Sequence, residues 1–170
     1  IRFWPTVTMQ HTADLAEIMV WKTALVGVPF GGGKSGIALD PGKFTRMQKT
    51  AILKEFVHVL RPDLMSGMYV PAPDMGTNAA DMAVIFGETH LPESITGKPP
   101  RVGGLPGRLE ATGRGLSTAV CAAAQKFLGR GPERLTVAIQ GFGNVGSWCA
   151  RFLHEYGAKV VAVADISGGV

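Results

Sequence analysis

The chain has 170 residues, of which 46% are hydrophobic, and we expect one globular domain or two small ones with an apolar core. No run of about 18 consecutive apolar residues is present, so a membrane-spanning protein is not expected. The net charge of +4 comes from scattered basic residues, which argues against a nucleic-acid partner. The sequence begins at Ile1 without a Met and stops just after a predicted strand, so we expect an internal piece of a longer protein.

The first quarter of the chain contains a predicted helix and a glycine-rich loop. Apolar residues at helical spacing predict a helix over residues 12–26, with Thr12 as its N-cap and Gly27 at its end. Residues 29–36 are too rich in glycine for the interior of an element. A short strand is predicted over residues 37–39.

Two further helices are predicted before residue 90. The first is amphipathic and covers residues 45–60. Its predicted apolar face consists of Ala51, Ile52, Phe56, Val59 and Leu60. A short strand over residues 68–70 leads into a proline-rich turn, and Thr77 is predicted to cap a helix that runs to Phe86.

The second half of the chain reads as a β-α-β unit. The pattern breaks down into Pro, Gly and Lys over residues 91–107, which makes this segment the predicted domain boundary. A helix is then predicted, followed by a strand, a helix and a strand, over residues 110–128, 135–140, 145–156 and 159–164. The last three elements favour a parallel sheet with a right-handed crossover, so the fold class is α/β.

Two cysteines, Cys121 and Cys149, lie in apolar, helix-like surroundings. There is no CxxC motif and no His/Cys cluster with metal-ligand spacing, so no metal site is predicted. We expect two buried free thiols in a reducing compartment.

The GxGxxG sequence at residues 141–146 follows a predicted strand and opens a predicted helix. In this context Gly141 makes the tight turn, Gly143 lets the backbone approach a pyrophosphate, and Gly146 allows close packing of helix and strand. Asp165 ends the next strand, where an acid accepts hydrogen bonds from the adenosine ribose. The alternatives are a plain β-α-β turn for the glycines and a solvated acid for Asp165.

Two lysines twelve residues apart, Lys22 and Lys34, frame the glycine-rich loop. A phosphate-binding P-loop would require glycine at position 28, which is Val28, and a strand before the loop, where a helix is predicted. Lys34 among glycines can instead approach a substrate closely, and a lowered pKa would let its amine polarise a carbonyl or exchange protons. Lys22 would supply a neighbouring charge or bind a carboxylate; alone, it would read as an exposed helix lysine.

Asp74 lies in a turn between Pro71, Pro73 and a glycine. The two prolines fix φ and hold the carboxylate in one place, as a catalytic group requires. The alternative is an acid at the N-terminus of the helix that begins near Thr77.

Taken together, these residues resemble the glutamate dehydrogenase family, within the Glu/Leu/Phe/Val amino-acid dehydrogenases. The matching stretches follow one another in a family-like order along essentially the whole chain: IRFWPTVT, WKTALVGVPFGGGKSGIALDP, YVPAPDMGT, ITGKPPRVGGLPGRLEATGRG and VAIQGFGNVG. The resemblance implies that residues 1–103 form a substrate-binding and oligomerisation domain and that residues 104–170 begin a Rossmann-type NAD(P)-binding domain.

The resemblance also implies residue roles. Lys34 would be the catalytic lysine, Asp74 the acid that shuttles protons to and from the amino group, and Lys22 the ligand of the substrate α-carboxylate. The residues implied in cofactor binding are Thr112, at the nicotinamide end, and Gly141, Gly143, Asn144, Val145, Gly146 and Asp165.

The implied activity is NAD- or NADP-dependent oxidative deamination of L-glutamate to 2-oxoglutarate and ammonium. Asp165 mildly favours NAD because a carboxylate repels a 2′-phosphate. The alternatives are a leucine, phenylalanine or valine dehydrogenase, and a non-catalytic subunit of the same family. The family forms oligomers, usually hexamers, and a cytoplasmic location is expected, or the mitochondrial matrix in a eukaryote.

Three departures from the family pattern bear on these expectations. A lysine that binds the distal carboxylate of the substrate would precede Ile1, and a later substrate-contacting serine would follow Val170. Ser35 occupies a position that is commonly glycine.

Overall fold

The structure of the protein is a computed structural model, and it describes all residues from Ile1 to Val170. Contacts between residues divide the chain into two compact units, Ile1–Leu105 and Pro106–Val170. Both units mix helices with strands, which confirms the predicted α/β class. No helix is long and apolar enough to cross a bilayer.

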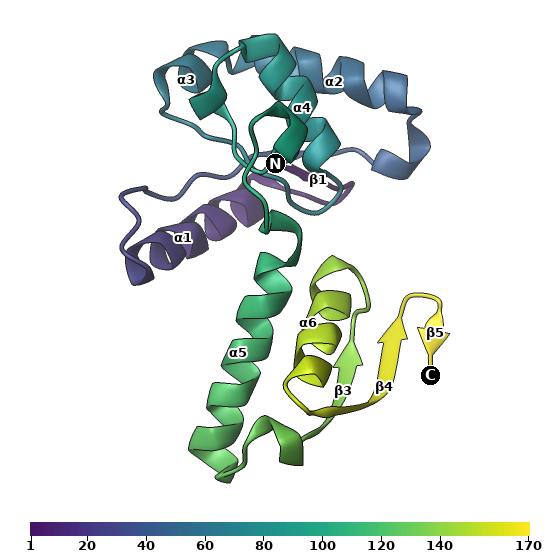
Figure 1. Cartoon of the computed structure of the whole chain (residues 1–170). Coiled ribbons are helices and arrows are strands. Elements are labelled where there is room, and N and C mark those ends of the chain that lie inside the picture. Colours follow the sequence, from purple (N-terminus) through teal and green to yellow (C-terminus); the bar gives the residue numbers. More distant parts are fainter. The chain divides into compact units, whose positions relative to one another are not determined.

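The first unit is built on a two-stranded parallel sheet. Strand β1 (Arg2–Phe3) pairs with β2 (Gly36–Ile37), so that Arg2 lies opposite Gly36 and Phe3 opposite Ile37. The helices are α1 (Met9–Leu25), α2 (Arg46–Val59), α3 (Arg61–Ser66) and α4 (Ala79–Thr89), and 3-10 turns form at η1 (Pro41–Lys43), η2 (Pro92–Ser94) and η3 (Pro100–Val102). Within this unit α2, α3 and α4 gather on one side of β1, and α1 lies on the other side (Figure 1).

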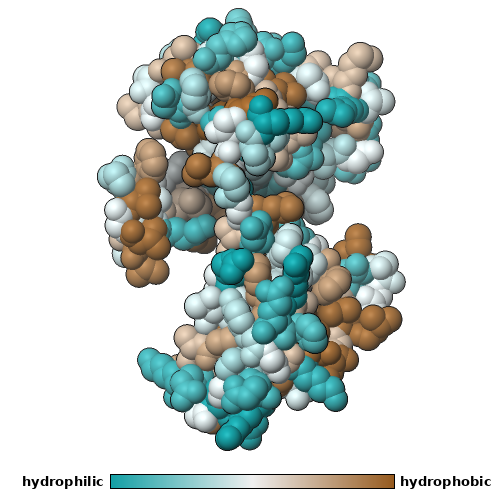
Figure 2. All heavy atoms as spheres, viewed as in Figure 1, coloured by the Kyte–Doolittle hydropathy of each residue, from teal (hydrophilic) through white to brown (hydrophobic).

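The apolar core of the first unit lies under α2, α3 and α4. It contains Ile1, Leu53, Val57, Leu64, Met82, Ile85 and Ile95. Helix α1 contributes no buried residue, and hydrophobic side chains gather on its exposed surface (Figure 2). Trp21 and Leu25, for example, are 69% and 89% exposed.

Helix α1 begins three residues earlier than predicted. The N-cap is Thr8, whose Oγ1 accepts a hydrogen bond from the amide of His11 at 3.1 Å. Thr12, the predicted cap, lies inside the helix and donates its hydroxyl to the carbonyl of Thr8. Both threonines fit the residue preference of an N-cap, so the sequence alone does not distinguish them. The prediction of Thr12 as the cap was wrong. Gly27 follows the helix with φ +67°, the left-handed conformation that ends helices.

Helix α2 was predicted with nearly correct bounds, and its predicted apolar face is only partly the buried one. Leu53 and Val57, one turn apart, are fully or almost fully buried, whereas Val59 is 66% exposed and Ala51 is also exposed. Ile52, Phe56 and Leu60 are partly buried. Apolar residues surround much of this helix, so its periodicity fits more than one face, and packing against α4 selects the one through Leu53 and Val57.

The segment between α3 and α4 differs from the prediction in two ways. Residues 68–70 form no strand; the amide of Tyr69 bonds the carbonyl of Asp63 and finds no neighbouring strand. Helix α4 is capped by Asn78, whose side chain accepts hydrogen bonds from the amides of Ala80 and Asp81. Thr77, the predicted cap, takes part in the preceding turn, and the helix ends beyond Phe86, at Thr89.

The second unit contains the predicted β-α-β arrangement. Its elements are α5 (Arg108–Leu128), η4 (Pro132–Arg134), β3 (Thr136–Gln140), α6 (Asn144–Glu155), β4 (Lys159–Asp165) and β5 (Gly168–Gly169). Strands β3 and β4 are parallel, as predicted, and β5 adds a short antiparallel strand that was not predicted. Helix α5 packs on α6 at Gly113, where an added Cβ would lie 2.4 Å from the Cβ of Trp148.

Candidate functional site

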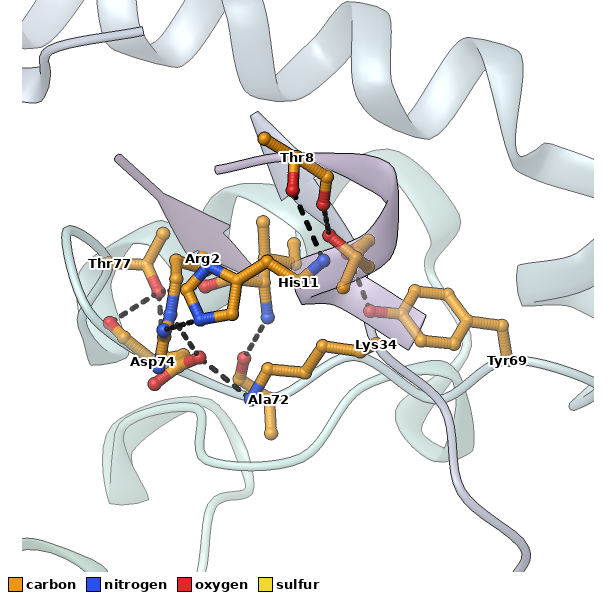
Figure 3. Close-up of polar contacts among 11 residues, drawn as sticks. Arg2, Thr8, His11, Lys34, Tyr69, Ala72, Asp74 and Thr77 are labelled. Carbon is orange, nitrogen blue, oxygen red and sulfur yellow. Dashed lines mark hydrogen bonds and ion pairs between the residues drawn. The ribbon is translucent and has the colours of Figure 1, made fainter. Parts of the chain in front are cut away.

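An ion pair joins two of the predicted site residues. The Nζ of Lys34 lies 2.7 Å from Oδ2 of Asp74, and the two side chains are only 15% and 23% exposed (Figure 3). A lysine and a carboxylate at this distance form a charge-assisted hydrogen bond, which is shorter and stronger than one between neutral groups. The loop after α1 and the turn before α4 supply these groups, forty residues apart in the sequence.

Two of the three glycines before Lys34 lie in close packing. At Gly32 an added Cβ would lie 2.0 Å from the carbonyl oxygen of Ala16 in α1. At Gly33 it would lie 3.2 Å from the ring of Tyr69. The backbone of the loop therefore lies directly on α1 and on Tyr69, with no room for side chains. The loop follows a helix, which excludes the P-loop interpretation.

The turn that holds Asp74 is tied to the N-terminal strand. The amide of Phe3 donates to the carbonyl of Met75 at 2.9 Å, and the hydroxyl of Thr77 donates to the carbonyl of Ile1 at 2.8 Å. Gly76 has φ +77°, and an added Cβ there would lie 1.9 Å from the carbonyl oxygen of Phe3. The carboxylate of Asp74 is thus held by the backbone of β1 as well as by its own prolines.

A second cation, Arg2, also contacts Asp74. Its Nε lies 3.2 Å from Oδ2 of Asp74, and its Nη1 lies 3.2 Å from Nε2 of His11. Arginine is only a donor, so Nε2 of His11 is the acceptor in this contact. Sequence reasoning missed Arg2 and His11, since nothing local links either of them to Asp74.

The two cations keep Asp74 ionised. Burial alone raises the pKa of this carboxyl, but the hydrogen bond from Lys34 and those from the Met75 amide and Arg2 outweigh it, and the pKa falls to about 2. The carboxylate of Asp74 is therefore negatively charged at neutral pH and accepts hydrogen bonds from both cations.

Lys22 is not part of this cluster. It lies near the end of α1, is exposed, and makes no hydrogen bond or ion pair. The structure therefore brings Lys34 and Asp74 together, and it leaves Lys22 as a free cation on the helix that precedes the loop of Lys34.

The glycine loop of the second unit forms a tight turn that opens a helix. Gly141 has φ +92° and makes the tight turn after β3. At Gly146 an added Cβ would lie 1.8 Å from the carbonyl oxygen of Gly141, so the helix packs against the turn without room for a side chain. At Gly143, the N-cap of α6, an added Cβ meets no atom within 4 Å, and no side chain caps the helix. The amides at this helix N-terminus are thus open to an anion, and the residues fit a dinucleotide.

The remaining predicted cofactor residues surround this loop or lie near its ends. The Nδ2 of Asn144 donates to the carbonyl of Leu109 at 2.9 Å and so ties the start of α6 to α5. Val145 is 38% exposed in the first turn of α6, and Thr112 is exposed on α5.

Asp165 ends β4, as predicted, and its carboxylate is engaged locally. Hydrogen bonds from the side chain and the amide of Ser167 lower the pKa of this exposed group. A ribose would have to share or replace these bonds.

A hydroxyl pair beside Lys34 was also missed by sequence reasoning. The Oγ of Ser35 lies 2.6 Å from the hydroxyl of Tyr69. The two residues are 34 positions apart, and the only signal was that Ser35 stands where glycine is common.

Comparisons with known proteins agree along the whole chain. Residues 1–91 match the family described as Glu/Leu/Phe/Val dehydrogenase, dimerisation domain, and residues 103–170 match Glutamate/Leucine/Phenylalanine/Valine dehydrogenase. The NADP-specific glutamate dehydrogenase of Saccharolobus shibatae is 44% identical over 100% of the chain and 41% of its own length. The glutamate dehydrogenase of Thermotoga maritima is also 44% identical, over 100% of the chain and 42% of its own length.

Solved structures give the same result. The hetero-hexameric glutamate dehydrogenase of Thermus thermophilus superposes with a TM-score of 0.92 at 33% identity, over 99% of the chain and 42% of that structure. The enzyme of Peptoniphilus asaccharolyticus superposes with a TM-score of 0.81 at 35% identity, over 96% of the chain and 43% of that structure. The chain thus spans about two fifths of the length of the relatives it matches.

Proposed function

We propose that this chain, which belongs to the Glu/Leu/Phe/Val dehydrogenase family, carries out the reversible, NAD(P)-dependent oxidative deamination of L-glutamate to 2-oxoglutarate and ammonium. The observation that carries the proposal is the 2.7 Å contact between Lys34 and Asp74. Relatives named glutamate dehydrogenase, at 38% to 44% identity over the whole chain, support glutamate over leucine, phenylalanine or valine as substrate.

The proposed chemistry needs one group that moves protons to nitrogen and one that activates water. NAD(P), when bound, accepts the hydride from the α-carbon of glutamate, which leaves an imine. Lys34 first gives the ammonium proton that it carries in the ion pair to solvent. The neutral amine then takes a proton from the water that attacks the imine carbon, and the ammonium form so regenerated polarises the resulting oxygen. Asp74, ionised at rest, accepts a proton from the substrate amino group before hydride transfer and returns it to the departing ammonia. Lys22 binds the α-carboxylate of the substrate.

The cofactor is proposed to lie on the glycine loop of the second unit. The pyrophosphate would meet the open amides at Gly143 and the N-terminus of α6, and Asp165 would accept hydrogen bonds from the ribose. Thr112 would contact the nicotinamide end, while Gly141, Asn144, Val145 and Gly146 shape the turn.

Domain roles and assembly follow from the same proposal. Residues 1–103 would bind substrate and form the interface between subunits, and residues 104–170 would begin the NAD(P)-binding domain. The matching of residues 1–91 to a dimerisation domain supports a homo-oligomer, such as a hexamer. The free thiols of Cys121 and Cys149 support a reducing compartment such as the cytoplasm.

The proposal is tested by substituting Lys34→Ala in the full-length protein. We expect kcat with glutamate to fall by about 10²- to 10⁴-fold, the contribution of a positioned acid or base, with assembly intact by size-exclusion chromatography. Lys159→Ala, an exposed lysine on β4 without an ion pair, is the matched control. Normal turnover in Lys34→Ala would refute the mechanism, and faster turnover of leucine or phenylalanine by the unaltered protein would refute the substrate.

A further inference from the structure

The loop that carries Lys34 has no secondary structure of its own to hold it. Between the end of α1 and β2 the chain forms no helix or strand, and Gly31 meets no neighbouring atom where a Cβ would stand. A lysine amine stands on a flexible four-carbon stem, so the side chain alone does not fix the position of the amine. Some contact outside the loop must therefore fix Lys34 against Asp74.

Tyr69 contacts the loop on both sides of Lys34. Its hydroxyl lies 2.6 Å from Oγ of Ser35, the residue after Lys34. Its ring lies against Gly33, the residue before Lys34, where a Cβ would be 3.2 Å from the ring. Figure 3 shows Tyr69 beside the segment that carries Lys34.

Tyr69 is itself well anchored. Its side chain packs against the apolar core of the first unit, and its amide donates to the carbonyl of Asp63 at 3.1 Å. Burial raises the pKa of the Tyr69 hydroxyl, so the group stays protonated at neutral pH and either oxygen of the pair can donate. Ser35 is fixed on its other side, since its carbonyl accepts a hydrogen bond from the amide of Arg2 at 2.9 Å.

We propose that the hydrogen bond between Ser35 and Tyr69 is a positioning device for Lys34: it holds the backbone just after this lysine, while the Tyr69 ring packs just before it, so that the amine meets Asp74. The inference rests on the proposed function, because it assigns the pair to the catalytic lysine of that reaction. The hydroxyl of Ser35 is the only partner that the Tyr69 hydroxyl has in the protein. Neither hydroxyl is proposed to touch the substrate.

The test uses three variants of the full-length protein: Tyr69→Phe, Ser35→Ala and the double variant. Tyr69→Phe keeps the ring against Gly33 and removes only the hydroxyl. We expect each single variant to lower kcat with glutamate by about 3- to 10-fold, the effect of one lost hydrogen bond, with little change in KM. Because both substitutions remove the same bond, the double variant should be no slower than the slower single variant.

A second readout does not depend on activity. Competitive acetylation of the protein without substrate, read by mass spectrometry, compares Lys34 with the exposed Lys159. Loosening of the loop in Tyr69→Phe should raise the labelling of Lys34 relative to Lys159 by about the same 3- to 10-fold. Tyr156→Phe is the control, since Tyr156 is 37% exposed and its hydroxyl makes no hydrogen bond.

The outcomes separate the two proposals. If the unaltered protein does not oxidise glutamate but Tyr69→Phe still exposes Lys34 to acetylation, the proposed function fails and the pair is supported as a positioning device. If labelling is unchanged, or if labelling rises while kcat does not fall in an active enzyme, the positioning role is overturned. Effects of the two single substitutions that multiply in the double variant would also overturn it.

Discussion

The two regions assigned to catalysis and to cofactor binding are built in different ways. The glycine loop of the second unit is one contiguous stretch, residues 141–146, and each glycine has a local reason. The cluster around Asp74 draws on Arg2 and Lys34, which are 72 and 40 positions away in the sequence. A contiguous site can be perturbed one glycine at a time, whereas a cluster built by tertiary contacts depends on each segment that delivers a group.

The largest effect is expected at the carboxylate. Asp74→Asn keeps the shape of the side chain but removes the base and the charge that faces Lys34 and Arg2. We expect kcat to fall by about 10²- to 10⁴-fold. Binding of NAD(P)H, followed by nucleotide fluorescence, should be unchanged because the cofactor loop belongs to the other unit. A variant with normal kcat, or one that loses nucleotide affinity instead, would break this division of roles.

Two glycines of the cofactor loop should respond in opposite ways. Gly146→Ala places a Cβ 1.8 Å from the carbonyl oxygen of Gly141, so we expect a loss of about 1–3 kcal/mol in the free energy of unfolding. Gly143→Ala meets no protein atom, so it should fold normally and weaken only NAD(P)H binding, by restricting approach of the pyrophosphate. Urea unfolding and fluorescence titration of both variants provide the measurement. Equal destabilisation by the two substitutions would contradict the geometry.

The same contrast can be made in the loop of Lys34. Gly32→Ala would place a Cβ 2.0 Å from the backbone of α1, whereas Gly31→Ala meets nothing within 4 Å. We expect Gly32→Ala to destabilise the protein by about 1–3 kcal/mol and to lower kcat, because the loop must move away from α1. Gly31→Ala should change either quantity little. Thermal unfolding and steady-state kinetics decide between these outcomes. If Gly32→Ala changed neither the stability nor kcat, the loop would be able to adopt another conformation that does not pack on α1.

These contrasts also show how much the sequence could predict. The β-α-β unit and the roles of Gly141 and Gly146 depend on neighbours close in the chain, and the structure agrees with the predicted geometry there. The observed helix bounds differ from the predicted ones where two nearby residues could both act as the cap, as Thr8 and Thr12 could for α1. The buried face of α2 and the absence of a strand at residues 68–70 depend on tertiary packing neighbours, which the periodicity of the sequence does not identify.

The candidate site divides in the same way. Lys34 and Asp74 carried local signals, a glycine loop and a proline turn, and the structure brings them together. Arg2, Ser35 and Tyr69 carried no such signal, because their contacts arise only when β1 and the segment before the proline turn fold against the loop. Lys22 was singled out by its spacing from Lys34, yet it makes no ion pair or hydrogen bond with Lys34 or Asp74.

The smallest expected effect is the pH dependence of stability that arises from Asp74. Its pKa is lowered to about 2 in the folded protein, below the value of about 3.9 for an unfolded aspartate. The folded state therefore binds this proton less readily than the unfolded state, so the contribution to stability is complete above about pH 4 and is lost as the pH falls toward 2. Chemical unfolding of the unaltered protein and Asp74→Asn between pH 2 and pH 6 measures it. The difference in unfolding free energy between the two proteins should stay constant at and above about pH 4 and shrink as the pH falls from there toward 2. A difference that does not change with pH would mean that Lys34 and Arg2 leave the titration of Asp74 untouched, and that the ion pair is absent in solution.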